Sequence, residues 1–266
     1  MRLDVAYDGT DFAGWAVQPD QRTVQGVLED ALKTVLRSDI SPLVAAGRTD
    51  AGVHASGQVC HVDVPSQTPA ELPAERLTYR LSRLLPNDLR VRRVSVAPAG
   101  FDARFSALGR RYIYRICDDP SAADPLQRRS TLWWRRSLDV PAMMAASQTL
   151  LGEHDFAAFC KPRAGATTIR TLRTFAWVRS AETVEATVVA DAFCHSMVRA
   201  LVGCLLVVGA GARPVTWPAE ILRAGVRDSR VSVVPAHGLT LAAVRYPPPS
   251  ELADRAATAR AVRTLS

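Results

Sequence analysis

Residues 2–37 read RLDVAYDGTDFAGWAVQPDQRTVQGVLEDALKTVLR, and this segment gives the clearest local indication of the fold class. Residues 2–7 alternate apolar and polar side chains, as a half-buried strand does, and the Asp-Gly pair that follows predicts a turn. Thr23 can cap a helix that runs to about Arg37. The apolar face of that helix is formed by Val24, Val27, Leu28, Ala31, Leu32, Val35 and Leu36.

The elements expected next along the chain complete a split β-α-β unit. Strands are expected at residues 42–46 and 56–64, on either side of a loop that contains glycine. A helix is expected at residues 73–85, and residues 89–96 (LRVRRVSV) again alternate like a strand. The order strand, helix, strand, strand, helix, strand is that of a ferredoxin-like unit.

The rest of the chain predicts a second unit of the same kind. We expect an α+β fold of two ferredoxin-like halves, residues 1–105 and 106–247, joined into an extended antiparallel sheet with helices on one face. Residues 118–131 are expected to form a loop, and residues 248–266 a flexible tail. The strands of the second half are expected at 109–117, 172–179, 184–190 and 239–246, and its helices at 139–151 and 195–209.

The composition predicts a globular protein with a polyanionic partner. Of its 266 residues, 48% are apolar and 22% are charged, which suits a substantial core. A formal net charge of +7 favours binding to phosphates, because basic side chains displace the counterions of phosphates. Charge alone does not identify the partner.

Cysteine spacing and the N-terminus predict a cytoplasmic protein. The five cysteines are odd in number and no pair has Cys-x-x-Cys spacing, so neither a disulfide framework nor a structural zinc site is expected. Free thiols suit a reducing compartment. The first four residues, MRLD, lack the apolar run of a signal peptide. The uncharged apolar stretch between Arg199 and Arg213 is too short to cross a membrane.

The loop AGRTDAGVH at residues 46–54 is the strongest candidate for chemistry. Its glycines permit sharp turns and close approach by a ligand around an arginine, a hydroxyl and a carboxylate. Arg48 and Asp50 are near enough to meet across the turn, and a neighbouring cation favours an ionised carboxylate. An ionised carboxylate can attack carbon. From the spacing alone, an ion pair that only stabilises the turn is more common than a catalytic pair.

A series of segments resembles one known family. Residues 47–54 (GRTDAGVH), followed by Gly57-Gln58-Val59, resemble the active-site motif of the tRNA pseudouridine synthase A family. The resemblance runs in order from about residue 2 to residue 247, which makes it far more specific than any single motif. Further matches are YDGT at 7–10, Phe12, Gly14-Trp15, LPNDL at 85–89, FDARFSA at 101–107, RRYIY at 110–114, LGEHDF at 151–156, Arg170-Thr171, Phe193, His195, MVR at 197–199 and Gly203.

The sequence departs from the family's pattern outside the catalytic loop. Ala16 stands where a glutamine is common after the tryptophan. Ser196 replaces a second histidine, and Ala200 replaces an asparagine. Residues 160–168 match poorly. These departures concern RNA contact and helix packing rather than the carboxylate.

The resemblance implies that Asp50 is the nucleophile of an isomerisation. In this family uracil is detached from the ribose, turned, and rejoined through carbon instead of nitrogen. Because there is no net redox change or group transfer, the resemblance implies no cofactor. Arg48 and Arg199 are the expected ion-pair partners of Asp50. Alternatively, Arg199 snorkels from the start of its apolar helix.

The resemblance also implies a tRNA substrate, held in an RNA-binding cleft between the two halves. The family acts as a homodimer on uridines 38, 39 and 40 of the anticodon arm, and such a nucleotide must be turned out of its stack. Tyr112 is the expected aromatic platform and Leu241 is expected to contact the base, although Tyr112 could be an ordinary sheet residue and Leu241 a core residue. RNA contacts are expected from Phe101, Arg104, Phe105, Arg110, Arg111, Lys161, Arg163 and Arg170.

Two other classes of function stay open at this point. One is an RNA-binding protein without catalysis, which would keep the basic clusters and could dispense with Asp50. The other is a metal-dependent hydrolase that uses Asp50, His54, His61 and Asp63. No third convergent ligand appears at a familiar spacing, so we expect no metal site.

Overall fold

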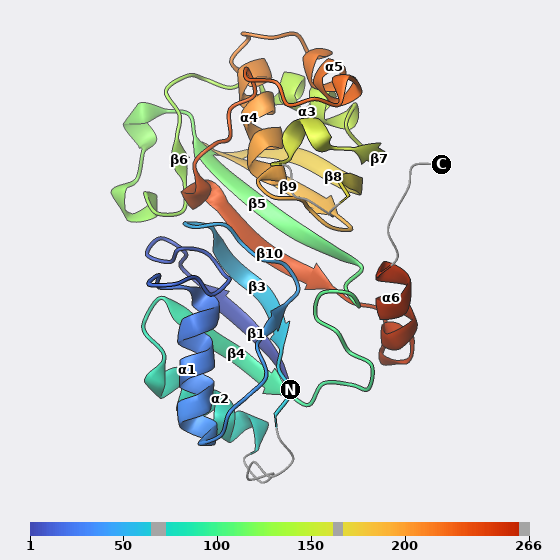
Figure 1. Cartoon of the computed structure of the whole chain (residues 1–266). Coiled ribbons are helices and arrows are strands. Elements are labelled where there is room, and N and C mark those ends of the chain that lie inside the picture. The colour runs from blue at the N-terminus through green and yellow to red at the C-terminus, as the bar shows by residue number, and fades with distance from the viewer. Residues whose placement is uncertain (65–72, 162–166, 261–266) are drawn as a thin grey trace. The chain divides into compact units, whose positions relative to one another are not determined.

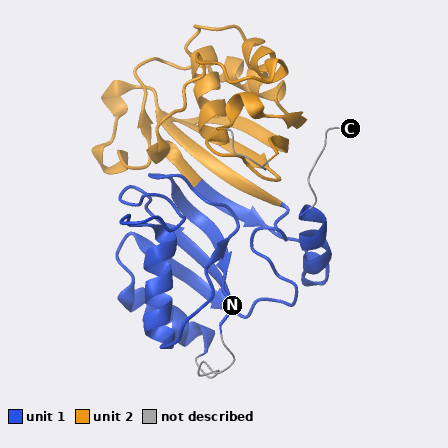
Figure 2. Cartoon of the chain, viewed as in Figure 1, with its two compact units in different colours: residues 1–108, 241–261 blue, residues 109–240, 262–266 orange. Residues whose placement is uncertain are grey.

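The computed structural model describes residues 1–64, 73–161 and 167–260. The chain folds as two compact units (Figure 1). As Figure 2 shows, the first unit combines residues 1–108 with residues 241–261, and the second contains residues 109–240.

The first unit is built on an antiparallel sheet that begins with the first strand of the chain. Strand β1 (Arg2–Tyr7) lies between β3 (His54–His61) and β4 (Leu89–Ser95) and is antiparallel to both. The short β2 (Val44–Ala45) pairs antiparallel with β3, and β10 (Leu239–Arg245) also neighbours β3. The order β4-β1-β3-β2 is that of a split β-α-β unit.

Two helices cover one face of this sheet. They are α1 (Val24–Leu36) and α2 (Ala74–Leu84), which contact each other (Figure 1). The Thr23 hydroxyl caps α1 by accepting the Gly26 N–H at 3.2 Å, as the sequence predicts. The face of α1 that packs inward is the predicted apolar one, so local periodicity alone locates both β1 and α1. Large buried side chains of this core are Leu3, Leu28, Leu32, Leu77, Leu81 and Leu89.

The segment expected to be a flexible tail contains a helix that packs on the first unit. A 3₁₀ turn, η5 (Pro249–Glu251), leads into α6 (Leu252–Ala259), and Leu252 is buried. The buried Ser106 hydroxyl donates to the carbonyl of Leu252, the first residue of α6, at 3.0 Å.

The main strands of the second unit follow one another in the order β5-β9-β8-β7. Strand β5 (Gly109–Cys117) pairs with β9 (Thr183–Ala190), and β9 pairs with β8 (Ile169–Ser180). β8 in turn pairs with β7 (Gly152–Asp155) at the sheet edge, and the two-residue β6 (Leu132–Trp133) runs parallel to β5. Side chains of β9 alternate between buried and half-buried positions, as a strand with one covered face requires.

The helices in the described part of this unit are α3 (Val140–Gln148), α4 (Met197–Gly209) and α5 (Trp217–Ala224). Helix α4 is buried along almost its whole length, which explains its apolar sequence. It starts two residues later than expected, because Ser196 has a φ of 62° and cannot belong to a right-handed helix. Short 3₁₀ turns are η1 (Pro120–Ala122), η2 (Pro125–Gln127), η3 (Ala157–Phe159) and η4 (Ala236–Gly238).

These units confirm the predicted α+β class. Among the residues that the structure describes, no helix has the length and apolar character needed to span a bilayer.

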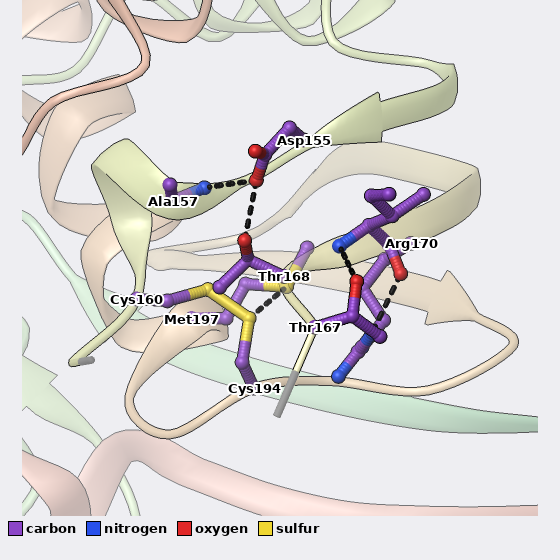
Figure 3. The surroundings of a disulfide bond; sticks show 9 residues. Asp155, Ala157, Cys160, Thr167, Thr168, Arg170, Cys194 and Met197 are labelled. Atoms are coloured by element: carbon purple, nitrogen blue, oxygen red, sulfur yellow. Dashed lines mark hydrogen bonds between the residues drawn. A yellow bond between two sulfur atoms is a disulfide. The ribbon is translucent and has the colours of Figure 1, made fainter. Parts of the chain in front are cut away.

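The expectation that every cysteine is a free thiol is wrong for one pair. Cys160 and Cys194 form a disulfide bond in the second unit, with Cα atoms 5.7 Å apart (Figure 3). The expectation was based on local spacing, whereas this pair is separated by 34 residues and is brought together only by the fold. The remaining cysteines are free and buried: Cys60, Cys117 and Cys204.

Candidate active site

Asp50 lies in the loop between β2 and β3, and backbone hydrogen bonds hold this loop on the segment that follows β1. The Thr49 carbonyl accepts the Trp15 N–H at 3.0 Å, and the Gly52 N–H donates to the Phe12 carbonyl at 3.3 Å. Within the loop, the Asp50 carbonyl accepts the Val53 N–H at 3.2 Å. Asp50 as a residue is half-buried, and these hydrogen bonds hold its backbone in place.

Two glycines allow the close approach of these backbones. A Cβ at Gly9 would lie 2.1 Å from the Val53 carbonyl oxygen. Gly14 has a φ of 99°, and a Cβ there would lie 2.9 Å from the Thr49 carbonyl oxygen. Neither position therefore has room for a side chain, which gives a physical reason for both glycines.

The two histidines of the possible metal site accept hydrogen bonds from backbone N–H groups. The Nδ1 atom of His54 accepts the Gly9 N–H at 2.9 Å and lies 3.1 Å from the carboxylate of Asp8. The Nδ1 atom of His61 accepts the Ala103 N–H at 3.0 Å, and burial lowers the pKa of this histidine. Within the described ranges, no group of three or more His, Cys, Asp or Glu side chains is arranged to hold a metal ion.

Tyr112 and Arg199 belong to the second unit. Tyr112, on β5, is buried, and the ring of Phe193 meets it edge-on with centroids 5.2 Å apart. Arg199 lies in the first turn of α4 and donates from Nε to the Val234 carbonyl at 2.7 Å. Arg48 is exposed in the first unit. The pairing of Arg48 or Arg199 with Asp50 stays a prediction from the resemblance.

The predicted RNA contacts of the first unit form a packed aromatic segment. Phe101 packs against the ring of Tyr246 at 5.1 Å. The guanidinium carbon of Arg104 lies 4.8 Å from the centre of the Phe105 ring. That of Arg260, the residue after α6, lies 4.9 Å from the same centre. Two cations thus lie within cation–π distance of one half-exposed ring. Leu241, in contrast, is fully buried in β10.

The basic candidates of the second unit differ in accessibility. Arg110 is buried and donates from Nη1 to the Asp191 carbonyl at 2.6 Å, whereas Arg111 is exposed on β5. Arg170 is half-buried and donates to the Ile169 carbonyl. Lys161 is exposed, and Arg163 lies outside the described residues. Of these arginines, the exposed Arg111 is the best placed to meet solvent-borne phosphate.

Three residues of the first unit, all within the matched motifs, are given no role by the sequence analysis. Tyr7, Thr49 and Gln58 are buried and hydrogen-bonded beneath the loop of Asp50. The alternation of β1 predicts that Tyr7 is buried, and Gln58 belongs to the matched motif. No local signal shows that the two side chains meet.

Known proteins resemble this chain along its whole length. The family described as tRNA pseudouridine synthase matches residues 5–106 and 146–247. A tRNA pseudouridine synthase A of Frankia casuarinae is 60% identical over 264 residues, covering 99% of this chain and 95% of the relative. The Streptomyces griseus protein of the same name is 59% identical, with 100% and 94% covered. The one from Mycobacterium leprae is 51% identical, with 99% and 95% covered. Together with the loop that carries Asp50, these matches confirm the resemblance: the chain belongs to the tRNA pseudouridine synthase family.

Proposed function

We propose that this chain isomerises uridine to pseudouridine at positions 38, 39 and 40 of the tRNA anticodon arm, with Asp50 as the nucleophile. We further propose that it works as a homodimer in the cytoplasm. The observation that carries the proposal is the Asp50 loop, in which a half-buried aspartate belongs to a backbone segment that neighbouring segments hold in place.

The proposed reaction is balanced without a co-reactant. Attack by the carboxylate of Asp50 on the nucleotide gives a covalent intermediate. The bond between the ribose and N1 of uracil breaks, and a bond from the ribose to C5 replaces it. C5 loses a proton and N1 gains one, after which the carboxylate is released. The atoms and electrons of substrate and product are therefore the same, and we propose no cofactor.

The substrate would reach Asp50 as an everted nucleotide. A uridine in a base-paired stem must leave its stack before a side chain can reach it. Tyr112 is the proposed aromatic platform for the displaced base. The exposed guanidiniums of Arg104 and Arg111 are proposed to bind the phosphates around it, since the net charge of +7 favours RNA.

Replacement of the carboxylate tests the proposal. We expect Asp50→Ala to form no pseudouridine in purified tRNA while it binds that tRNA about as well as the unaltered protein. Asp30→Ala is the matched control, because Asp30 is an exposed aspartate on α1. Mapping pseudouridine along the tRNA reads out both the activity and the position. Full turnover by Asp50→Ala would overturn the assignment, and product confined to another arm of the tRNA would overturn the proposed positions.

A further inference from the structure

Three polar side chains are buried together under the Asp50 loop. Tyr7 on β1 is 5% exposed, Thr49 in the loop is 7% exposed, and Gln58 on β3 is 0% exposed. A buried polar group destabilises the fold unless it is hydrogen-bonded. All three therefore need partners inside the protein.

These side chains satisfy one another and the loop. The hydroxyl oxygens of Tyr7 and Thr49 are 2.8 Å apart. The Nε2 atom of Gln58 donates to the Gly47 carbonyl at 2.7 Å and to the Tyr7 hydroxyl at 3.4 Å. The amide nitrogen of Gln58 donates to the Tyr7 oxygen, and either hydroxyl can be the donor between Tyr7 and Thr49. Burial raises the pKa of Tyr7 to about 12, so the Tyr7 hydroxyl keeps its proton throughout the neutral range.

The network links rigid strands to the residues that precede Asp50. β1 and β3 are paired antiparallel, with Val5 opposite Gln58. From this pair, Tyr7 holds the residue next to Asp50, and Gln58 holds Gly47 at the start of the loop. The side-chain contacts therefore act on the same short segment as the backbone hydrogen bonds.

We propose that Tyr7 and Gln58 are positioning residues, which hold the Asp50 carboxylate at the reacting uridine through Thr49 and Gly47. This inference is based on the function proposed above, in which Asp50 is the nucleophile. Misplacement of a catalytic group by about 1 Å can slow a reaction about 100-fold. The RNA-contacting side chains are separate from these residues, so tRNA binding should be largely unaffected.

Removal of single hydroxyls tests the role of the network. Tyr7→Phe keeps the ring but deletes the hydroxyl that meets Thr49. We expect kcat to fall about 10- to 100-fold while KM for tRNA changes less than about twofold. Thr49→Val should lose activity in the same way, whereas Thr49→Ser, which keeps a hydroxyl, should restore most of it.

A second buried hydrogen bond supplies the control for stability. Trp177 Nε1 donates to the Ser147 hydroxyl at 2.8 Å in the second unit. Ser147→Ala should lower Tm about as much as Tyr7→Phe does, because each variant removes one hydrogen-bond partner of a buried polar group. Ser147→Ala should not lower kcat.

The outcomes separate this inference from the proposed function. An unchanged kcat in Tyr7→Phe, beside an inactive Asp50→Ala, would overturn the positioning role alone. Equal activities of Thr49→Val and Thr49→Ser would overturn it as well. Activity in Asp50→Ala would overturn the nucleophile assignment and this inference with it.

Discussion

Replacing Gly203 by alanine should stabilise the helix through its propensity but destabilise the packing around it. Alanine is favoured over glycine inside a helix by about 1 kcal/mol. In α4, however, a Cβ at Gly203 would lie 1.9 Å from the Ser232 carbonyl oxygen. A carbon–oxygen contact needs about 3.3 Å, so the two backbones must separate by about 1.4 Å. Overpacking of a core typically costs about 1–3 kcal/mol, and a clash with backbone belongs at the upper end. We expect a net loss of about 2 kcal/mol in the free energy of unfolding.

Urea unfolding measures this loss, and Gly26→Ala is the matched control. Gly26 is also helical, but its nearest neighbour is the Thr23 side-chain oxygen at 3.0 Å, which can shift. We expect that variant to stay within about 1 kcal/mol of the unaltered protein. Activity should fall in Gly203→Ala as well, because the displaced segment carries the Val234 carbonyl that accepts from Arg199. A Gly203→Ala protein as stable as the original would contradict the predicted clash with the Ser232 carbonyl.

Two further predictions concern the second unit. Hydrogen bonds from both Nη atoms of Arg179, at 2.7 Å, lower the pKa of the buried Asp118. The stability from this pair should be present above the ordinary carboxyl range, near pH 4, and be lost as the pH falls further. Asp118→Asn should lower the free energy of unfolding by on the order of 2 kcal/mol at pH 7 and weaken its dependence on pH below about 4. If unfolding titrations of the variant show the same loss of stability at acidic pH as the original protein, the prediction is wrong. Because the Cys160–Cys194 bond closes a loop with a separation of 34 residues, a thiol reductant should destabilise the oxidised protein by about 3–4 kcal/mol. Tm should fall with reductant in the original protein but not in Cys160→Ser, and equal shifts in both would argue against the bond.

The elements that the sequence predicts well are those with a local cause. The strand at residues 2–7 and the helix after Thr23 follow from side-chain alternation and a capping hydroxyl, both of which act within a few residues. β7 (Gly152–Asp155) has no apolar alternation and becomes a strand by pairing with β8. Such an edge strand depends on a partner farther along the chain, which periodicity does not reveal.

The candidate site also combines features that local sequence indicates with contacts that only the fold creates. Asp50 is proposed from the resemblance of its own loop to the family's motif, whose residues are adjacent in sequence. The contact between Tyr7 and Thr49 joins residues 42 positions apart, and that between Tyr7 and Gln58 joins residues 51 apart. The alternation that predicts a buried Tyr7 is correct, but it gives no information about where the hydroxyl points. Strand pairing supplies that information.

Gly9 and the buried network both make possible the close approach of the segment after β1 to the Asp50 loop. Gly9 lets the turn after β1 approach the Val53 carbonyl, which a side chain would prevent. Once the backbones are this close, water is excluded and each polar group between them must find a partner in the protein. Tyr7 and Gln58 are those partners on the strand side. The early YDGT segment and the later GRTDAG segment therefore act as one structural unit. A rigid setting of this kind suits the proposed role of Asp50, in which its carboxylate forms and breaks a covalent bond in a single geometry.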